Sequence, residues 1–217
     1  MRQRIDAAIA RAGRPPGCVQ LIAVSKTFPA VTVREAYDAG QRHFGENRIQ
    51  DFEARRVDMQ WPGAVWHFIG HLQSNKAARA AQLFDIIHTV DSVSLAERLD
   101  TQRQKQEARP LPVLIEVKLS GEASKTGASE PEVMALAAAI RQLKHLELRG
   151  VMTMPPWSLD PEVARPYFRR LREIASRIEV TELSMGMTND FETAIEEGST
   201  MVRVGTAIFG MRAGKRA

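Results

Sequence analysis

The chain has 217 residues, of which 44% are hydrophobic and 26% are charged, as in an ordinary globular protein. No apolar run approaches the roughly 18 residues that a membrane span needs, and the N-terminus lacks the apolar core of a signal peptide. The single cysteine, Cys18, excludes an internal disulfide. These features predict a cytoplasmic protein that does not enter a membrane.

The net charge of +4 permits nucleic-acid binding on charge alone. The basic residues, however, alternate with acids on segments of helical spacing, which is typical of a solvated helix face. Aromatic residues make up only 6% of the chain, and no aromatic-rich strand motif of the RNA-binding kind is present. We therefore expect no nucleic-acid partner.

The predicted elements alternate along the whole chain. Helical spacing over residues 1–13 predicts an N-terminal helix, and eight short apolar runs follow. They begin at Leu21, His43, Val65, Asp85, Pro112, Leu148, Thr181 and Met201. Most of these runs are continuously apolar, which is typical of parallel strands covered on both faces.

Helical patterns lie between the apolar runs. Gly40 and Gly198 are candidate helix ends, and Ser129 is a candidate N-cap followed by acids in the first turn. Either Asp91 or Ser92 is a further N-cap, whereas Pro166 indicates a kink or the true start of its helix. The predicted helices fall within residues 30–40, 91–108, 129–143, 160–178 and 190–198.

Eight strands alternating with helices predict an α/β protein, either a doubly wound sheet or a barrel. Strand number and short connections favour a single (β/α)8 TIM-type barrel over residues 1–217, with an extra N-terminal helix. The alternative, a doubly wound nucleotide-binding fold, needs G-x-G-x-x-G after the first strand, where this chain has "SKTFPAV".

Polar residues at the predicted strand ends indicate a phosphate site. Ser184 and Gly186 follow the seventh strand, and Gly205 and Thr206 follow the eighth. In barrels these two loops often bind phosphate through backbone N–H groups and small hydroxyls. The alternative interpretation is that these small residues only shape turns.

Lys26 ends the first predicted strand, and we expect it on the opposite side of the barrel mouth from the phosphate loops. An amine beside an apolar wall is easier to deprotonate and can attack a carbonyl carbon. A phosphorylated aldehyde held at the mouth would then form a Schiff base with Lys26. Pyridoxal phosphate binding and a Schiff-base aldolase acting on a phosphosugar both fit this arrangement.

Six stretches, in this order, closely resemble the pyridoxal phosphate homeostasis proteins, whose barrel resembles the N-terminal domain of alanine racemase. They are "AVSKTFP", "FGENRIQDF", "WHFIGHLQSNK", "HTVDS", "GVMTMPP" and "LSMGMTNDFETAIEEGSTMVRVGTAIFG". The resemblance implies a protein that holds pyridoxal 5'-phosphate as a Schiff base and stores, buffers or delivers it inside the cell.

The resemblance also implies roles by position. Lys26 matches the residue in Schiff-base linkage, Arg203 matches an arginine against the pyridine nitrogen, and Asn47 lies near the cofactor. Ser184, Gly186, Gly205 and Thr206 match the positions where the family binds the phosphate. Lys125 matches a loop lysine of the family, and a solvated loop lysine is the interpretation that we prefer for it.

The resemblance further implies that catalysis is absent. An arginine at the ring nitrogen disfavours its protonation and leaves a poorer electron sink. Racemisation needs a second base, which the related racemase takes from a second domain that we expect this chain to lack. Tyr37 and Tyr167 fall in predicted helices, where we expect them to pack. His67 or His71 could supply the base, but we prefer to interpret His67 as a strand residue with a satisfied hydrogen bond and His71 as a loop residue.

Three alternatives therefore stay open: a non-catalytic cofactor carrier, a racemase-type enzyme that uses pyridoxal phosphate, and a Schiff-base aldolase. We expect a monomer whose partners are the cofactor and apo-enzymes that depend on it. No metal site is expected, because His67 and His71 are spaced for a helix but lie on a strand and its loop.

Overall fold

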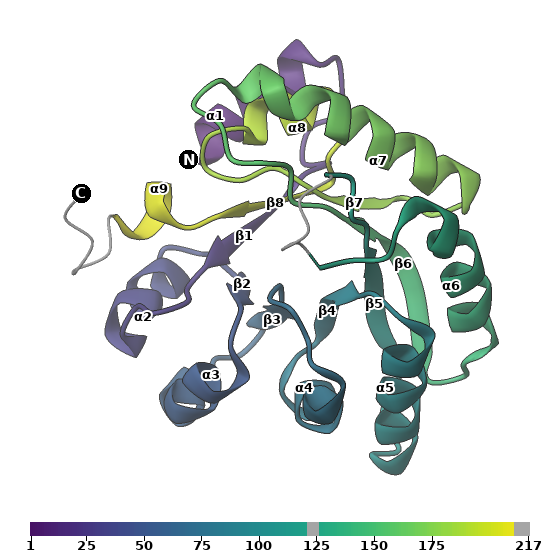
Figure 1. The fold of residues 1–217 in the computed structure, drawn as a ribbon. Helices are drawn as coiled ribbons and strands as arrows, with labels where there is room; N and C mark the ends of the chain where they lie inside the picture. The colour runs from purple at the N-terminus through teal and green to yellow at the C-terminus, as the bar shows by residue number, and fades with distance from the viewer. Residues whose placement is uncertain (121–125, 211–217) are drawn as a thin grey trace.

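The structure is a computed structural model that describes residues 1–120 and 126–210. Eight parallel strands form a closed barrel in sequence order, and β1 pairs with β8 through Ala23 and Val204 (Figure 1). The predicted (β/α)8 barrel is therefore confirmed, and a doubly wound sheet is excluded. The strands are β1 (Gln20–Val24), β2 (His43–Glu46), β3 (Val65–Phe68), β4 (Ile86–Val90), β5 (Leu111–Glu116), β6 (Leu146–Met152), β7 (Glu182–Ser184) and β8 (Met201–Val204).

Helices surround the barrel on its outside (Figure 1). The α-helices are α1 (Arg2–Arg11), α2 (Ala30–Asp38), α3 (Ile49–Arg56), α4 (Ala77–Leu83), α5 (Val93–Lys105), α6 (Glu130–Gln142), α7 (Arg165–Arg177), α8 (Phe191–Glu196) and α9 (Thr206–Phe209). Within the described residues, the short 3₁₀ helix η1 (Val57–Met59) follows α3, η2 (Ser74–Lys76) precedes α4, and η3 (Pro161–Ala164) precedes α7. No helix within the described ranges is long and apolar enough to cross a bilayer.

Several helix boundaries confirm the sequence signals. Gly40, two residues after the end of α2, adopts a φ of 92°, a conformation that other residues rarely adopt. Ser129 and Glu132 form a capping box at the start of α6. Pro166 lies in the first turn of α7, so it marks the start of that helix and not a kink.

The helices α3 and α4 lie outside the predicted helical segments. The buried face of α4 consists mainly of Ala77, Ala80 and Ala81, so it presents little of the large apolar periodicity that reveals a helix in a sequence. Both helices are short, and their stability depends on packing against the barrel rather than on their own propensity.

The extra N-terminal helix is confirmed, and it packs outside the barrel beside α8 (Figure 1). Ile5, Ala8 and Ile9 of α1 form a buried cluster with Phe191 and Ile195 of α8. Burying an aliphatic side chain of the size of isoleucine contributes about 1.5–3 kcal/mol, so these contacts hold α1 against α8.

Candidate functional site

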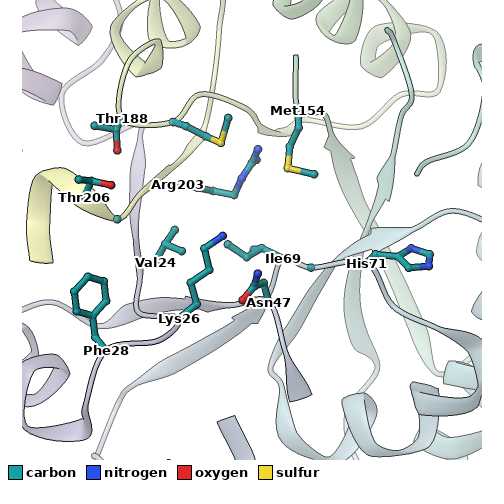
Figure 2. A pocket seen from close by; sticks show the side chains of 13 residues that line it. Val24, Lys26, Phe28, Asn47, Ile69, His71, Met154, Thr188, Arg203 and Thr206 are labelled. Atoms are coloured by element: carbon teal, nitrogen blue, oxygen red, sulfur yellow. The ribbon is translucent and has the colours of Figure 1, made fainter. Parts of the chain in front are cut away.

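A cavity of about 390 Å³ lies at the carboxyl ends of the barrel strands (Figure 2). Five of the seven residues predicted to bind a cofactor line it: Lys26, Asn47, Arg203, Gly205 and Thr206. These residues follow or belong to β1, β2 and β8, which barrel closure brings together. The structure thus gathers residues that are up to 180 positions apart in the sequence (Thr206 against Lys26) around one space.

The expected position of Lys26 opposite the phosphate loops is wrong. Because β1 pairs with β8, Lys26 and Thr206 follow neighbouring strands. The close approach is visible at Gly205, where an added Cβ would lie 3.3 Å from the carbonyl oxygen of Val24. Figure 2 shows the Lys26 side chain extending into the cavity, with Thr188 and Thr206 at one end of the space and Arg203 facing it.

A buried ion pair holds the turn that carries Lys26. Ser25 Oγ donates to Glu46 Oε1 at 2.7 Å, and Arg55 Nη2 lies 3.0 Å from both oxygens of the same carboxylate. Arg55 also donates through Nη1 to the carbonyl of Phe28. Both ends of the turn are therefore fixed by one network, in which Glu46 is fully buried. Burial raises the pKa of Glu46, and the charge of Arg55 opposes that rise.

The turn itself is strained beside the lysine. Phe28 N donates to the carbonyl of Ser25 at 3.1 Å and closes the turn. Thr27, within it, has a φ of 71°, which is unusual for a β-branched residue. Such a conformation costs of order 1–3 kcal/mol and persists only where the surroundings impose it. The Glu46 network supplies that constraint, so the direction of Lys26 is set by its neighbours.

Arg203 is a buried cation at the floor of the cavity. Arg203 is only 3% exposed. Its guanidinium donates to Ser184 Oγ at 2.6 Å and to the carbonyl of Thr153 at 3.0 Å. Burial lowers its pKa to about 10, with Asp190 and Glu116 opposing the shift, so it stays charged at neutral pH. Arg203 is therefore not a solvated surface arginine.

Ser184 and Gly186 do not line the cavity. Ser184 is fully buried, and its hydroxyl contacts Arg203 and His88 inside the barrel. Gly186 has a φ of 95°, and an added Cβ there would lie 2.6 Å from the Cβ of Ala194, so this glycine lets α8 approach the loop. A phosphate contact by either residue stays a prediction.

Asn47 reaches the cavity through an unusually close approach of two strand ends. A Cβ added at Gly70 would lie 2.2 Å from the carbonyl oxygen of Asn47, so only glycine fits there. Thr89 Oγ1 donates to the Gly70 carbonyl at 2.6 Å and fixes that loop. Asn47 is thus positioned by the backbone behind it.

Most of the cavity walls could not be located from the sequence. Apolar side chains supply them: Val24, Phe28, Ile69, Met154 and Met187. Val24 is the last residue of β1, but Phe28 and the methionines lie in loops, where periodicity gives no signal. Thr188, in the loop after β7, and His71, in the loop after β3, also line the cavity.

His67 in β3 and His71 in the loop after it differ in environment. His67 is confirmed as a buried strand residue with hydrogen-bond partners, since its ring contacts His43 and His88. His71 instead lies at the mouth, with its Nδ1 atom 3.9 Å from an oxygen of Asp91. Lys125 lies outside the described residues, and its predicted role is untested.

A (β/α)8 barrel with a lysine just after its first strand, in a cavity at the carboxyl ends of the strands, defines the class of protein. The family described as "Alanine racemase, N-terminal domain" matches residues 1–213. Solved structures under 25% identical, such as a Helicobacter pylori diaminopimelate decarboxylase with a TM-score of 0.70 and 13% identity, show the shared fold alone.

More similar relatives narrow the class. A Vibrio alginolyticus protein named "Pyridoxal phosphate homeostasis protein" is 46% identical over 93% of this chain and 90% of its own. The Escherichia coli K12 protein of that name is 46% identical over 98% of this chain and 94% of its own. The structure of PipY from Synechococcus elongatus PCC7942 with PLP bound covers 95% of this chain and 100% of its own, at 40% identity and a TM-score of 0.84. The chain belongs to the pyridoxal phosphate homeostasis protein family, as its motifs predict.

Proposed function

We propose that this protein binds pyridoxal 5'-phosphate as a Schiff base on Lys26 and serves the intracellular homeostasis of that cofactor. One observation carries the proposal: the Lys26 side chain enters the same cavity that Gly205 and Thr206 line. The amine that would bond to the cofactor and the turn that would bind its phosphate follow neighbouring strands, β1 and β8.

The residues present fit this cofactor. The cavity volume is in the range of small-molecule sites, about 300–1,000 Å³. The apolar side chains of Val24, Ile69 and Met187 offer flat contact to a ring, whereas Thr188 and Thr206 offer hydroxyl donors to a phosphate. Arg203 has only donor groups, so it suits a ring nitrogen that keeps its lone pair.

The chain's own residues determine what happens at the aldehyde. Lys26 would hold the cofactor through its amine, which would bond to the aldehyde carbon with loss of water. The cofactor supplies electron withdrawal into its ring when it is bound, and that withdrawal is weak while the ring nitrogen is unprotonated. The site therefore favours holding the cofactor over activating an amino acid.

Relatives support the same assignment. The Vibrio alginolyticus and Escherichia coli proteins carry the homeostasis name, and the Synechococcus elongatus structure contains PLP. We propose storage, buffering or delivery to apo-enzymes in a reducing cytoplasm, in keeping with the one free cysteine, Cys18. We also propose that the protein acts as a monomer.

The second candidate is a racemase-type enzyme, and one observation favours it. His71 lines the same cavity as Lys26 and lies beside Asp91, so the cavity contains a second titratable group. The tyrosines offer no such base, because Tyr37 Oη donates to the carbonyl of Pro62 and Tyr167 lies in α7. Assays of L-amino acids against free cofactor decide between the two: turnover that is lost in His71→Gln identifies an enzyme.

A Schiff-base experiment tests the main proposal. Purified protein loaded with pyridoxal phosphate is expected to absorb near the violet edge, and borohydride followed by peptide mapping should place the label on Lys26. Lys26→Ala is expected to lose that label, whereas Lys76→Ala, in η2 outside this cavity, should retain it. Labelling that persists in Lys26→Ala refutes the assignment, and an adduct with a phosphosugar but none with pyridoxal phosphate identifies an aldolase.

A further inference from the structure

Three histidines form an unbroken hydrogen-bonded chain through the barrel interior. His43 Nδ1 lies 2.9 Å from His67 Nε2, and His67 Nδ1 lies 2.9 Å from His88 Nε2. His88 Nδ1 then contacts Ser184 Oγ at 2.8 Å, and Ser184 Oγ accepts from Arg203 Nη1 at 2.6 Å. The chain begins at the first residue of β2 and crosses the barrel from β4 to β7 before it reaches the cavity at Arg203.

The arginine determines the direction of every bond in this chain. A guanidinium can only donate, so Ser184 Oγ accepts from Arg203. The serine hydrogen then points to His88 Nδ1, which leaves the hydrogen of His88 on Nε2. His88 Nε2–H donates to His67 Nδ1, and His67 Nε2–H donates to His43 Nδ1.

The reverse order leaves a buried hydrogen without an acceptor. If His88 donated through Nδ1, Ser184 Oγ would receive two donors, and its own hydrogen has no other partner among the described residues. An unsatisfied buried donor costs about 1–3 kcal/mol. The reverse order would also direct the positive end of an N–H bond toward the Arg203 cation.

We propose that His43, His67 and His88, with Ser184, form one directed relay that positions Arg203 as the donor at the cofactor cavity and couples it to the protonation of His43. The proposal rests on the proposed function for the identity of the ligand, but the relay itself belongs to the protein alone. The histidines are positioning residues, because none of them lines the cavity.

The surroundings keep the inner histidines neutral, as the relay requires. His67 and His88 are buried, and burial lowers both pKa values, that of His67 to about 3. His67 faces His43 and His88, whereas His88 faces His67, Ser184 and the charge of Arg203. Positive charge on either inner ring is therefore disfavoured from both sides.

His43 is the position where a proton can enter. It is partly exposed, and burial lowers its pKa while the carboxylate of Asp85 opposes that shift. A proton on His43 Nδ1 removes the acceptor of the His67 hydrogen, so His67 and His88 must both change tautomer. The final result is His88 donating to Ser184, in competition with Arg203.

Nitrogen NMR of the cofactor-free wild-type protein tests the direction. Long-range ¹H–¹⁵N spectra at pH 7.5 are expected to show His67 and His88 protonated at Nε2 and unprotonated at Nδ1. The opposite tautomer on either ring, or a mixture, overturns the proposal. This measurement needs no variant, so no folding defect can obscure it.

Two variants test the coupling in the same spectra. On acidification the wild type is expected to change the tautomers of His67 and His88 together, with one midpoint. His43→Gln keeps a carbonyl acceptor but cannot take a proton, so both tautomers should persist through that midpoint. Ser184→Ala should leave His88 in a mixture of both tautomers. His145→Gln should leave the tautomers of His67 and His88 unchanged, because His145 pairs with Asp100 and does not belong to the relay. Separate midpoints, or a wild-type response from His43→Gln, overturn the relay.

The cofactor-loaded protein separates this proposal from the proposed function. If the relay controls Arg203, His43→Gln removes a pH-dependent change in the absorbance of bound pyridoxal phosphate that the wild type and His145→Gln retain. A protein that shows the tautomer order but never binds pyridoxal phosphate disproves the function and keeps the relay. Binding without the tautomer order disproves the relay and keeps the function.

Discussion

The hydroxyl of Ser25 donates a 2.7 Å hydrogen bond to Glu46 Oε1, which ties the residue before Lys26 to the end of the neighbouring strand. Glu46 is fully buried, and its carboxylate is satisfied by Ser25 and by two contacts from Arg55. The strained backbone at Thr27 is therefore maintained by an ion pair at the rim of the barrel. Removing one member of that pair should affect both stability and the lysine.

Arg55→Ala is expected to destabilise the protein by about 3–5 kcal/mol, because it leaves the Glu46 carboxylate buried without its cation. Urea unfolding at pH 7.5 measures the change. Arg34→Ala is the control, since the exposed Arg34–Asp38 pair contributes about 0.3–0.5 kcal/mol and the contacts of Arg34 with the Tyr37 and Trp61 rings about 0.5–1 kcal/mol. Equal losses in the two variants would contradict a buried brace.

Thr206→Val is expected to weaken pyridoxal phosphate binding about tenfold to a hundredfold. The change removes a hydroxyl from the cavity but keeps the side-chain shape, and a hydrogen bond to a charged group contributes about 1.5–3 kcal/mol. Absorbance titration of the cofactor-free protein measures the affinity. Thr101→Val, whose hydroxyl donates to the Glu97 carbonyl on α5, should bind as the wild type does. Unchanged affinity in Thr206→Val would remove Thr206 from the phosphate site.

Arg203→Gln is expected to keep the borohydride-reducible adduct on Lys26 but to change its absorbance spectrum. Glutamine lacks the positive charge that disfavours a proton on the ring nitrogen, so the electronic state of the ring should respond. Spectra before and after reduction, with peptide mapping, separate the two effects. An adduct with an unaltered spectrum would show that Arg203 does not contact the ring.

The sequence predicts the barrel because apolar continuity records burial directly. Each of the eight runs covers most or all of a strand, since a parallel strand covered on both faces must be apolar along its length, although the last run also includes α9. The small helix α4 was missed because alanines bury little area, so its pattern resembles that of a loop. Periodicity therefore detects elements in proportion to the size of the side chains that they bury.

The site was only partly predictable for a different reason. Strand-end residues such as Lys26, Arg203 and Thr206 could be located, because topology places all strand ends at one mouth. Whether an inward residue reaches the cavity or stops beneath it depends on barrel stagger, which the sequence does not display. Ser184 and the histidine chain lie below the mouth for that reason, and only distances between strands reveal them.

The buried histidines should make the protein sensitive to acid. An unfolded histidine has a pKa near 6.5, whereas burial lowers that of His67 to about 3 in the folded protein. Below pH 6.5 the unfolded chain binds a proton that the folded chain refuses, so the free energy of unfolding decreases as pH falls from 6.5 toward 3. Each such histidine contributes a slope of about 1.4 kcal/mol per pH unit.

His67→Asn isolates this contribution. The variant should be less stable at pH 7.5, because His43 and His88 lose a partner, but its stability should decline less steeply between pH 6 and 4. Burial raises the pKa values of Glu46 and Glu116, so these carboxyl groups stabilise the folded protein as pH falls, which opposes the effect of His67. The informative quantity is therefore the difference in free energy of unfolding between the variant and the wild type. Urea midpoints across that range measure it. His145→Asn should retain the wild-type slope, and a slope equally steep in His67→Asn would show that His67 takes up its proton without unfolding.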